Sequence, residues 1–405
     1  MGILAVLDEN AASSPQRSSY AEKVEYHLVS WGEIYAPFSG NREHSRSGRI
    51  VLDKPPFELV SISEPYSPLP QKLCLRFTAP IETRPEARLT GVFPHEAAQE
   101  FAALLSVLTR RRVFAYQLSR SNGWPVEEQF EYYEQSHSQE RQRPKELEPT
   151  LVYDLMERLR TIDRPVAERF VVALRFYHAG VRMMYTEPEF AYLFLVICLE
   201  AIATLAFKEY VPEDRTAYLK DRYRGWEENE KLLAPEARGN FVEMLLRADK
   251  FVKRKVVKFV EEHVPDSFWD ESQDDSKPYY VTGMVGPGAA GAGQLSFKES
   301  ECALKNYERF SKAQLRKVLG RVYSARSKLL HSGINFPSTI VVGLFTRIPA
   351  QALTTTMAHA MAGRTSLDVP PLLTFERLVS RTLVNYLQNM TPTESIPGDA
   401  DKDSA

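Results

Sequence analysis

The sequence AQLRKVLGRVYSARSKLLHSG, residues Ala313 to Gly333, is the most informative stretch of the chain. Its apolar residues recur at the spacing of one face of an α-helix. These residues are Leu315, Val318, Leu319, Val322, Tyr323, Leu329 and Leu330. A glycine directly after such a pattern is typical of the position just past a helix end. The stretch therefore predicts an amphipathic helix over residues 313–331.

Two polar residues interrupt or end this helix, and they form the candidate site. Arg326 lies within the apolar stripe, and because its guanidinium keeps its charge, it needs an acidic partner or a wet cleft. His331 lies in the last turn. Five residues along a helix are about 140° apart. The two side chains therefore meet only if the helix ends or distorts at His331, or if a second subunit completes the site.

A second unusual charge lies in the run YLFLVICLEAIATL. Glu200 is the single charged residue of an apolar segment spanning residues 190–207. This segment is marginal in length for a membrane span and predicts a buried core helix. A carboxylate there must be partnered or protonated. We expect Glu200 to orient Arg326 or Arg381, which makes Arg381 a structural residue rather than a catalytic one.

The composition indicates a soluble, intracellular protein of one large domain or two ordinary ones. The chain has 405 residues and a net charge of -2, so contact with a polyanion requires a local basic patch. Cys74, Cys198 and Cys302 are scattered, which favours reduced, buried thiols in the cytosol over disulfides or zinc ligands. The N-terminus lacks the features of a signal peptide. No group of carboxylates or histidines has metal-ligand spacing, so we expect neither a metal nor a cofactor.

Secondary-structure patterns predict an α+β chain: a small, β-rich α+β domain followed by an all-α helical bundle. Residues 1–145 contain short β-rich segments separated by Pro, Gly and Ser, and one helix at 95–108. The predicted boundary lies near Pro144. Residues 146–392 form the helical domain, with a flexible Gly-rich insertion at 264–297, and residues 393–405 an acidic disordered tail. The predicted helices of this domain are 148–161, 165–181, 188–209, 236–263, 299–312, 313–331 and 371–390.

The segment RADKFVKRKVVKF is the most basic part of the helical domain. Lys250, Arg254 and Lys258 share one helical face and are candidate RNA-binding residues, together with Lys328 beside the candidate site. Such a face would attract phosphates without sequence preference. A solvated helix face is the more common role for such residues, and both interpretations remain open. The triple arginine at 110–112 suits a helix C-terminus and gives weaker evidence of the same kind.

The helical domain, ending VYSARSKLLHSG and followed by the closing helix FERLVSRTLVNYL, resembles the HEPN superfamily. The nearest match is the ApeA-like HEPN group of bacterial defence proteins. The HEPN signature is an arginine, usually a polar residue, and a histidine after four to six intervening residues. Here Arg326 is followed by Ser327 and, after four intervening residues, by His331; Tyr323 precedes it by one turn. With the Glu200 helix and Arg381, the resemblance covers about residues 150–390.

The resemblance implies a metal-independent endoribonuclease whose active site forms across a homodimer, each copy giving one arginine and one histidine. The substrate RNA supplies its own nucleophile, the 2′-hydroxyl. Arg326 can hold the scissile phosphate through paired hydrogen bonds, and His331 can transfer protons near neutral pH. The expected products carry a 2′,3′-cyclic phosphate and a 5′-hydroxyl.

The resemblance further implies a regulated effector of phage defence or abortive infection, with a sensing or binding role for the N-terminal domain. A phage-derived trigger or regulatory partner would then release its activity. The alternative is a non-catalytic HEPN module that binds a nucleotide, RNA or a protein. In that case Arg326 is a structural partner of Glu200, and His331 only ends its helix.

Overall fold

We describe the chain from a computed structural model, which confirms an α+β architecture. The residues that the structure describes are 3–4, 6–7, 21–30, 34–35, 49–54, 57–62, 72–80, 94–117, 141–142, 145–184, 186–223, 225–232, 234–248, 251–269, 278–279, 311–337, 340 and 369–391.

The N-terminal part contains a five-stranded antiparallel sheet with the strand order β3-β4-β5-β1-β6. Its strands are β1 (Ala21–Ser30), β3 (Arg49–Lys54), β4 (Phe57–Ile62), β5 (Lys72–Pro80) and β6 (Val113–Gln117). The register places Phe57 opposite Phe77, and Leu59 opposite Leu75. All four are buried, because alternate residues of each strand face the same side of the sheet.

Short strands pair elsewhere in the described chain. They are β2 (Ile34–Tyr35) with β8 (Lys145–Glu146), and β7 (Arg141–Gln142) with β9 (Pro278–Tyr279).

The helices that the structure describes are α2 (Pro94–Thr109), α4 (Pro149–Thr161), α5 (Arg164–Met183), α6 (Pro188–Ala206), α7 (Arg215–Arg222), α8 (Trp226–Leu232), α9 (Pro235–Ala248), α10 (Val252–His263), α12 (Lys312–Ser332) and α14 (Leu372–Asn389). A 3₁₀-helix, η3, spans Asp266–Trp269. The sequence-based helices at 95–108, 148–161, 165–181, 313–331 and 371–390 agree closely with α2, α4, α5, α12 and α14.

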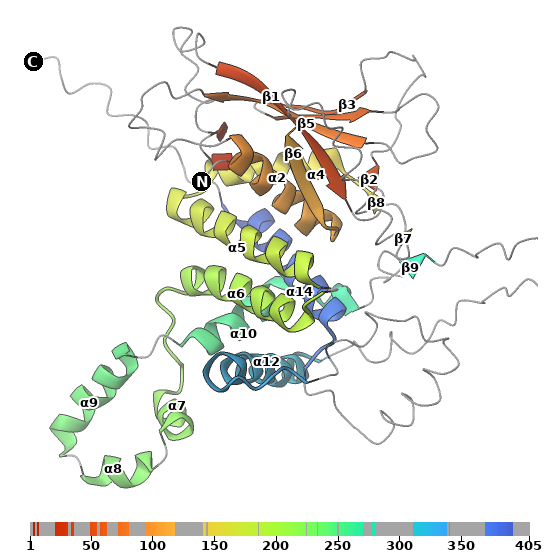
Figure 1. Ribbon diagram of the computed structural model, residues 1–405. Coiled ribbons are helices and arrows are strands. Elements are labelled where there is room, and N and C mark those ends of the chain that lie inside the picture. The colour runs from red at the N-terminus through yellow and green to blue at the C-terminus, as the bar shows by residue number, and fades with distance from the viewer. Residues whose placement is uncertain are drawn as a thin grey trace, which may run out of the picture.

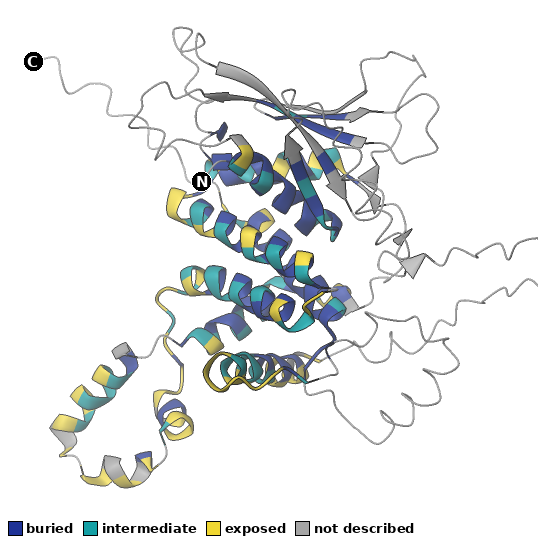
Figure 2. Cartoon of the chain, in the orientation of Figure 1, coloured by how far each residue is buried: buried dark blue, intermediate teal, exposed yellow. Residues whose placement is uncertain are grey.

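These elements stack in layers, with the sheet at the top of Figure 1, α2 beneath it, and α5, α6 and α12 following in turn. Helix α2 packs on the sheet, where the rings of Phe57 and Phe101 lie 5.1 Å apart. Its other side contacts α5. One cluster of buried residues continues from the sheet into the helical layers, as the dark blue residues of Figure 2 show. The core is therefore continuous across the predicted domain boundary near Pro144. The division into two domains stays a prediction.

Helix α6 lies at the centre of the helical layers, in contact with α5, α10, α12 and α14. It is the one helix in the described ranges that is long and apolar enough to cross a membrane, and half of its apolar window is buried inside the fold. The sequence-based expectation of a core helix over this segment agrees with that packing.

The prediction of one continuous helix over 236–263 is wrong. The chain has two helices here, α9 and α10, and Phe251 just before α10 has a left-handed backbone with φ of 49°. The Phe251 ring is buried against Tyr210 and Tyr218, at centroid distances of 6.0 and 5.0 Å. Burial of this ring in a separate aromatic cluster of α7–α9 overrides the helical preference of the local sequence.

The predicted insertion at 264–297 begins too early, since Val264 and Phe268 are buried in the main core. The remainder lies outside the described residues, apart from Trp269 and strand β9. The predicted helix over 299–312 lies almost entirely outside them, and so does the tail at 393–405.

Candidate functional site

Helix α12 begins and ends where its sequence predicts. Ser311 caps the N-terminus: its hydroxyl accepts a hydrogen bond from the backbone N–H of Gln314, whose side-chain oxygen accepts one from the Ser311 N–H. At the other end Gly333 is left-handed, with φ of 63°, and its N–H donates to the carbonyl of Leu329. The helix therefore continues past His331 without the distortion that a one-chain site would need.

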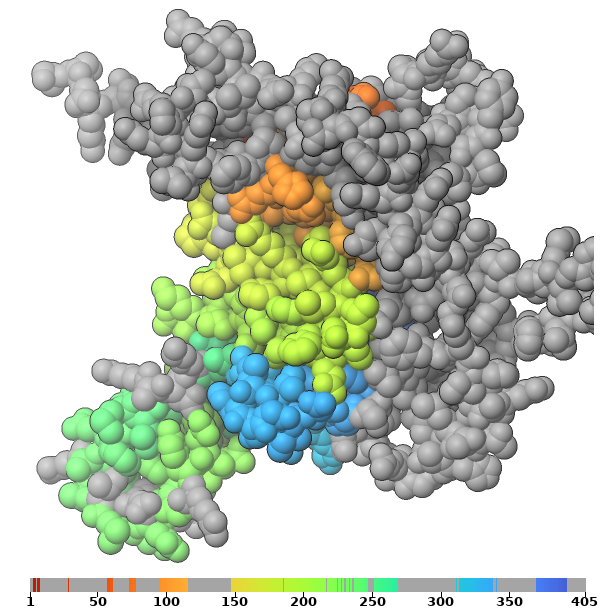
Figure 3. Space-filling view, in the orientation of Figure 1, coloured from red at the N-terminus to blue at the C-terminus, as the bar shows by residue number. Residues whose placement is uncertain are grey.

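One side of α12 packs on α6 and α10, and the other side is open. The packed side consists of Leu315, Val318, Leu319 and Val322, all buried. The opposite side forms part of the molecular surface, visible as the blue patch below α5 and α6 in Figure 3. Any function of α12 toward another molecule must use this open side or its C-terminal end.

Arg326 and Glu200 form the ion pair that the sequence suggests. The Arg326 Nη2 group donates to Glu200 Oε2 at 3.0 Å, and the two side chains are only 20% and 14% exposed. Burial raises the pKa of Glu200, and the nearby guanidinium lowers it by less, so its pKa lies above the ordinary value. Among the described residues, Glu200 bonds through its carboxylate to Arg326 alone.

This ion pair is incomplete. Glu200 Oε1 and Arg326 Nε are both buried, and neither has a hydrogen-bond partner in the described part of the chain. A guanidinium has five N–H donors, and Glu200 takes one of them. Nε is enclosed in the fold, but the side chain is 20% exposed, and its exposed part can meet a further acceptor, such as a phosphate oxygen.

Two other predicted residues lie on the same helix. The ring of Tyr323 is one turn before Arg326, with its centroid 5.6 Å from the guanidinium carbon. Ser327 is half-buried beside it. The Tyr323 ring thus flanks the guanidinium, and the roles of both residues stay predictions.

His331 is exposed, and within the described residues no hydrogen bond or ion pair holds its ring. It lies about 7.5 Å along the axis from Arg326 and about 140° around it. Arg326 points toward α6 and His331 toward solvent. One chain therefore presents the two side chains on different faces of α12.

An aromatic stack that sequence reasoning missed fixes the chain just beyond His331. Phe336 is buried, with its ring 4.8 Å from that of Tyr192 on α6, and Tyr192 stacks in parallel on Phe375 of α14 at 4.4 Å. The Tyr192 hydroxyl donates to the Pro370 carbonyl at 3.3 Å. The sequence holds no local signal for this stack, because aromatic residues are common in protein cores and their spacing does not specify their partners. His331 is thus held on a fixed helix end although it is exposed.

The predicted RNA-binding face of α10 is partly used within the fold. The Arg254 guanidinium lies 4.3 Å over the Tyr218 ring, and Lys258 lies over Phe207 and Tyr210. These contacts attach α10 to the segment around α7, which favours the structural interpretation of both cations. Lys250 lies outside the described residues, whereas Lys328 on α12 is exposed.

The remaining predicted arginines are engaged within the fold. Arg381 is half-buried on α14, and Arg326 rather than Arg381 binds the Glu200 carboxylate. In the 110–112 group, Arg111 is buried, and Arg112 donates to the carbonyl of Arg182. The idea that this group faces RNA is therefore not supported.

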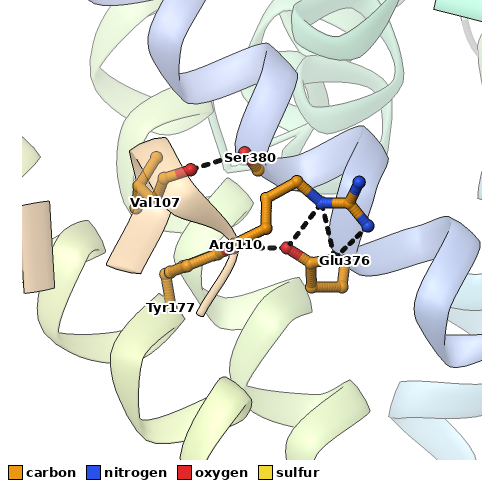
Figure 4. A network of polar contacts seen from close by, with 5 residues as sticks. All are labelled: Val107, Arg110, Tyr177, Glu376 and Ser380. Carbon is orange, nitrogen blue, oxygen red and sulfur yellow. Dashed lines mark hydrogen bonds and ion pairs between the residues drawn. The ribbon is translucent and has the colours of Figure 1, made fainter. Parts of the chain in front are cut away.

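Arg110 connects three helices (Figure 4). It ends α2 in a left-handed conformation and donates from Nη2 to Glu376 on α14 at 2.8 Å. The Tyr177 hydroxyl of α5 donates to the same carboxylate, and Ser380 of α14 donates to the Val107 carbonyl. Burial and the adjacent carboxylate raise the pKa of Tyr177. The network holds the N-terminal part against the helical layers.

The described residues contain no group of three or more His, Cys, Asp or Glu side chains that could hold a metal ion. Comparisons with protein-family models, with curated proteins and with solved structures find no match for this chain.

Proposed function

We propose that the chain is a metal-independent endoribonuclease of the HEPN type, with Arg326 and His331 as its catalytic residues. The proposal rests on how Arg326 is bound in the fold. Its guanidinium is held by Glu200 through one hydrogen bond and keeps other donors, and the same helix ends in an exposed histidine on an anchored turn. This combination of a fixed cation and an accessible proton-transfer group is what cleavage by the 2′-hydroxyl requires.

In the proposed reaction, a neutral histidine takes the proton of the 2′-hydroxyl, and the oxygen attacks the adjacent phosphorus. The bond to the 5′-oxygen breaks, and this oxygen takes a proton from a second, protonated histidine. Arg326 stabilises the charge that develops on the phosphate. The products are a 2′,3′-cyclic phosphate and a 5′-hydroxyl.

The proposal requires two copies of the chain. Arg326 and His331 diverge by about 140° on one regular helix. A two-fold related pair of α12 ends would supply two arginines and two histidines to one cleft, including the acid and the base. The proposed active form is therefore a homodimer.

The resemblance to bacterial defence proteins favours a regulated effector, activated by a phage-derived trigger or partner. The shared core and the Arg110–Glu376 bond give the N-terminal part a direct mechanical connection to the helical layers. This connection supports the N-terminal part as the control element.

The second candidate is a non-catalytic HEPN module that binds a nucleotide, RNA or a protein. The ion pair between Arg326 and Glu200 favours it, because a paired, mostly buried arginine has a structural role in many proteins. If this candidate is correct, the protein catalyses no reaction, and replacing His331 abolishes no activity.

RNA cleavage by the purified protein in the presence of a chelator tests the proposal. We expect wild type to release 5′-hydroxyl products, and Arg326→Ala and His331→Ala to lose at least about a hundredfold in rate. Arg316→Ala, on the same helix and paired with Glu261, and His263→Ala, bonded to the Phe259 carbonyl, are the matched controls. Folded variants that cleave like wild type, or a wild type that cleaves no RNA, would favour the non-catalytic module.

A further inference from the structure

The charge of α12 differs from that of the chain as a whole. Residues Lys312–Ser332 contain six lysines and arginines and no aspartate or glutamate, whereas the full chain has a net charge of -2. Positive charge is thus concentrated on the helix that carries the candidate site.

Several of these cations lie in one line on the open side of α12. Each residue turns the helix by 100°. Successive steps of four, three, four and three residues from Lys317 therefore reach positions that all lie within about 40° of Lys317 around the helix axis. We call this set the α12 stripe, and it consists of Lys317, Arg321, Ser324, Lys328 and His331. It is opposite the packed side formed by Leu315, Val318, Leu319 and Val322. The stripe is about 21 Å long and ends at the proposed catalytic histidine.

The lysines of the stripe are available to a ligand. Lys317 and Lys328 are exposed, and neither has an ion pair within the described ranges of the chain. Arg316 differs: although it is a neighbour of Lys317, it donates to Glu261 of α10. Lys317 and Lys328 therefore carry the same charge as Arg316, but no carboxylate of the described residues neutralises them.

A further cation lies beside the stripe because of Gly320. A Cβ atom at Gly320 would lie 3.3 Å from Cε and 3.6 Å from Nζ of Lys253. Lys253 belongs to α10 and is exposed. The absence of a side chain at Gly320 thus lets this ammonium group lie against α12, close to the middle of the stripe.

We propose that the α12 stripe, with Lys253 beside it, binds the phosphate backbone of single-stranded RNA and leads the strand to His331. The inference rests on the proposed ribonuclease function and adds to it the surface that holds the substrate. Lys317 and Lys328 are exposed and have no ion pair within the described ranges, so the phosphates of a bound strand can neutralise both of them. Contacts of this kind act through charge and counterion release, without reading the base sequence.

Salt-dependent binding of a short, fluorescein-labelled RNA tests the stripe, with 2′-O-methyl groups throughout so that 2′-hydroxyl attack is impossible. Fluorescence anisotropy of the full chain is measured over a range of KCl concentrations. We expect Lys317→Gln and Lys328→Gln to weaken binding equally for two unrelated sequences. Each should flatten the plot of log affinity against log salt by about 0.7, the contribution of one phosphate in a single strand. Arg316→Gln removes the same charge from the same helix and should leave the slope unchanged.

The stripe is refuted if the double variant Lys317→Gln/Lys328→Gln keeps the wild-type affinity and slope. It is equally refuted if Arg316→Gln produces the same loss, or if the protein binds anionic vesicles but no RNA. Failure of the ribonuclease has a different signature. Normal binding of the methylated RNA without cleavage of unmodified RNA would disprove the reaction and leave the stripe intact.

Discussion

Glu200 and Arg326 are an asymmetric pair. Burial opposes the ionised form of Glu200 more strongly than Arg326 favours it, so the pKa of Glu200 is raised in the folded chain. A raised carboxyl pKa means that the ionised group costs stability above that pKa, and that this cost disappears as the pH falls below it. The neutral form of Glu200 is therefore well tolerated, whereas a charged Glu200 without Arg326 is not.

This asymmetry predicts the stability of variants at neutral pH. Arg326→Ala leaves a buried carboxylate unpaired and should lower the free energy of unfolding by about 1–3 kcal/mol. Glu200→Gln should lower it by less. The double variant Glu200→Gln/Arg326→Ala should recover most of the loss of Arg326→Ala, because no unpaired charge remains. Urea unfolding measures all three, and additive losses in the double variant would contradict the predicted coupling.

His178 predicts a second, pH-dependent effect. It lies on α5 and is buried, with its ring N–H donating to the Val113 carbonyl of β6 at 2.7 Å. Burial, and the nearby charges of Arg182 and Arg112, lower its pKa from 6.5 to about 4. The unfolded chain therefore binds the proton more readily, and the stability contributed by neutral His178 is lost as the pH falls from 6.5 toward 4.

Between pH 7 and pH 5 this loss should amount to about 2 kcal/mol in the free energy of unfolding. His178→Gln keeps a donor for the Val113 carbonyl but does not titrate, so its difference from wild type isolates the histidine. Glu100 and Glu200 have raised pKa values, so their protonation makes the folded state more stable as the pH falls. This effect is the same in wild type and in His178→Gln, and it cancels in the difference between them. A pH-independent difference between His178→Gln and wild type would contradict the assignment.

At the scale of elements, the end of α2 combines an unfavourable backbone with a favourable bond. Arg110 has φ of 56°, a conformation suited to glycine, while its side chain neutralises Glu376, which is 4% exposed. Arg110→Ala should lower the free energy of unfolding by about 3–5 kcal/mol, because Glu376 is left unpaired. Arg110→Gly should lose about 1 kcal/mol less, because the backbone strain is removed. Equal losses for Ala and Gly would show that the backbone conformation carries no strain.

Local sequence signals predicted most individual elements. The terminal Gly333 and the apolar spacing before it predicted α12 almost to the residue. The same kind of reasoning failed at Phe251, because the helical pattern of 236–263 does not reveal that this ring is buried in a distant aromatic cluster. Elements are thus predictable where short-range chemistry dominates, and not where a tertiary contact overrides it.

At the scale of the whole molecule, rare charges were the informative long-range signal. The single carboxylate of one apolar helix, Glu200, predicted a distant arginine partner, either Arg326 or Arg381. The structure shows the bond to Arg326, which joins α6 to α12. The stack of Tyr192 on Phe336 and Phe375 was not predictable, because aromatic residues are common in cores and their partners are not specified by spacing. The continuity of the core from the sheet into the helical layers was missed for the same reason.

In the proposed dimer, Arg326 of one copy and His331 of the other meet in a site that cleaves RNA. This arrangement can be tested by mixing two variants. Arg326→Ala and His331→Ala are purified separately, unfolded and refolded together, and assayed for RNA cleavage with chelator present. We predict that each variant alone is inactive and that the mixture recovers part of the wild-type cleavage. A mixed dimer keeps one arginine and one histidine, which acts as the base, and water protonates the leaving 5′-oxygen in place of the missing second histidine. An inactive mixture, from variants that fold and dimerise beside an active wild type treated in the same way, would contradict the claim.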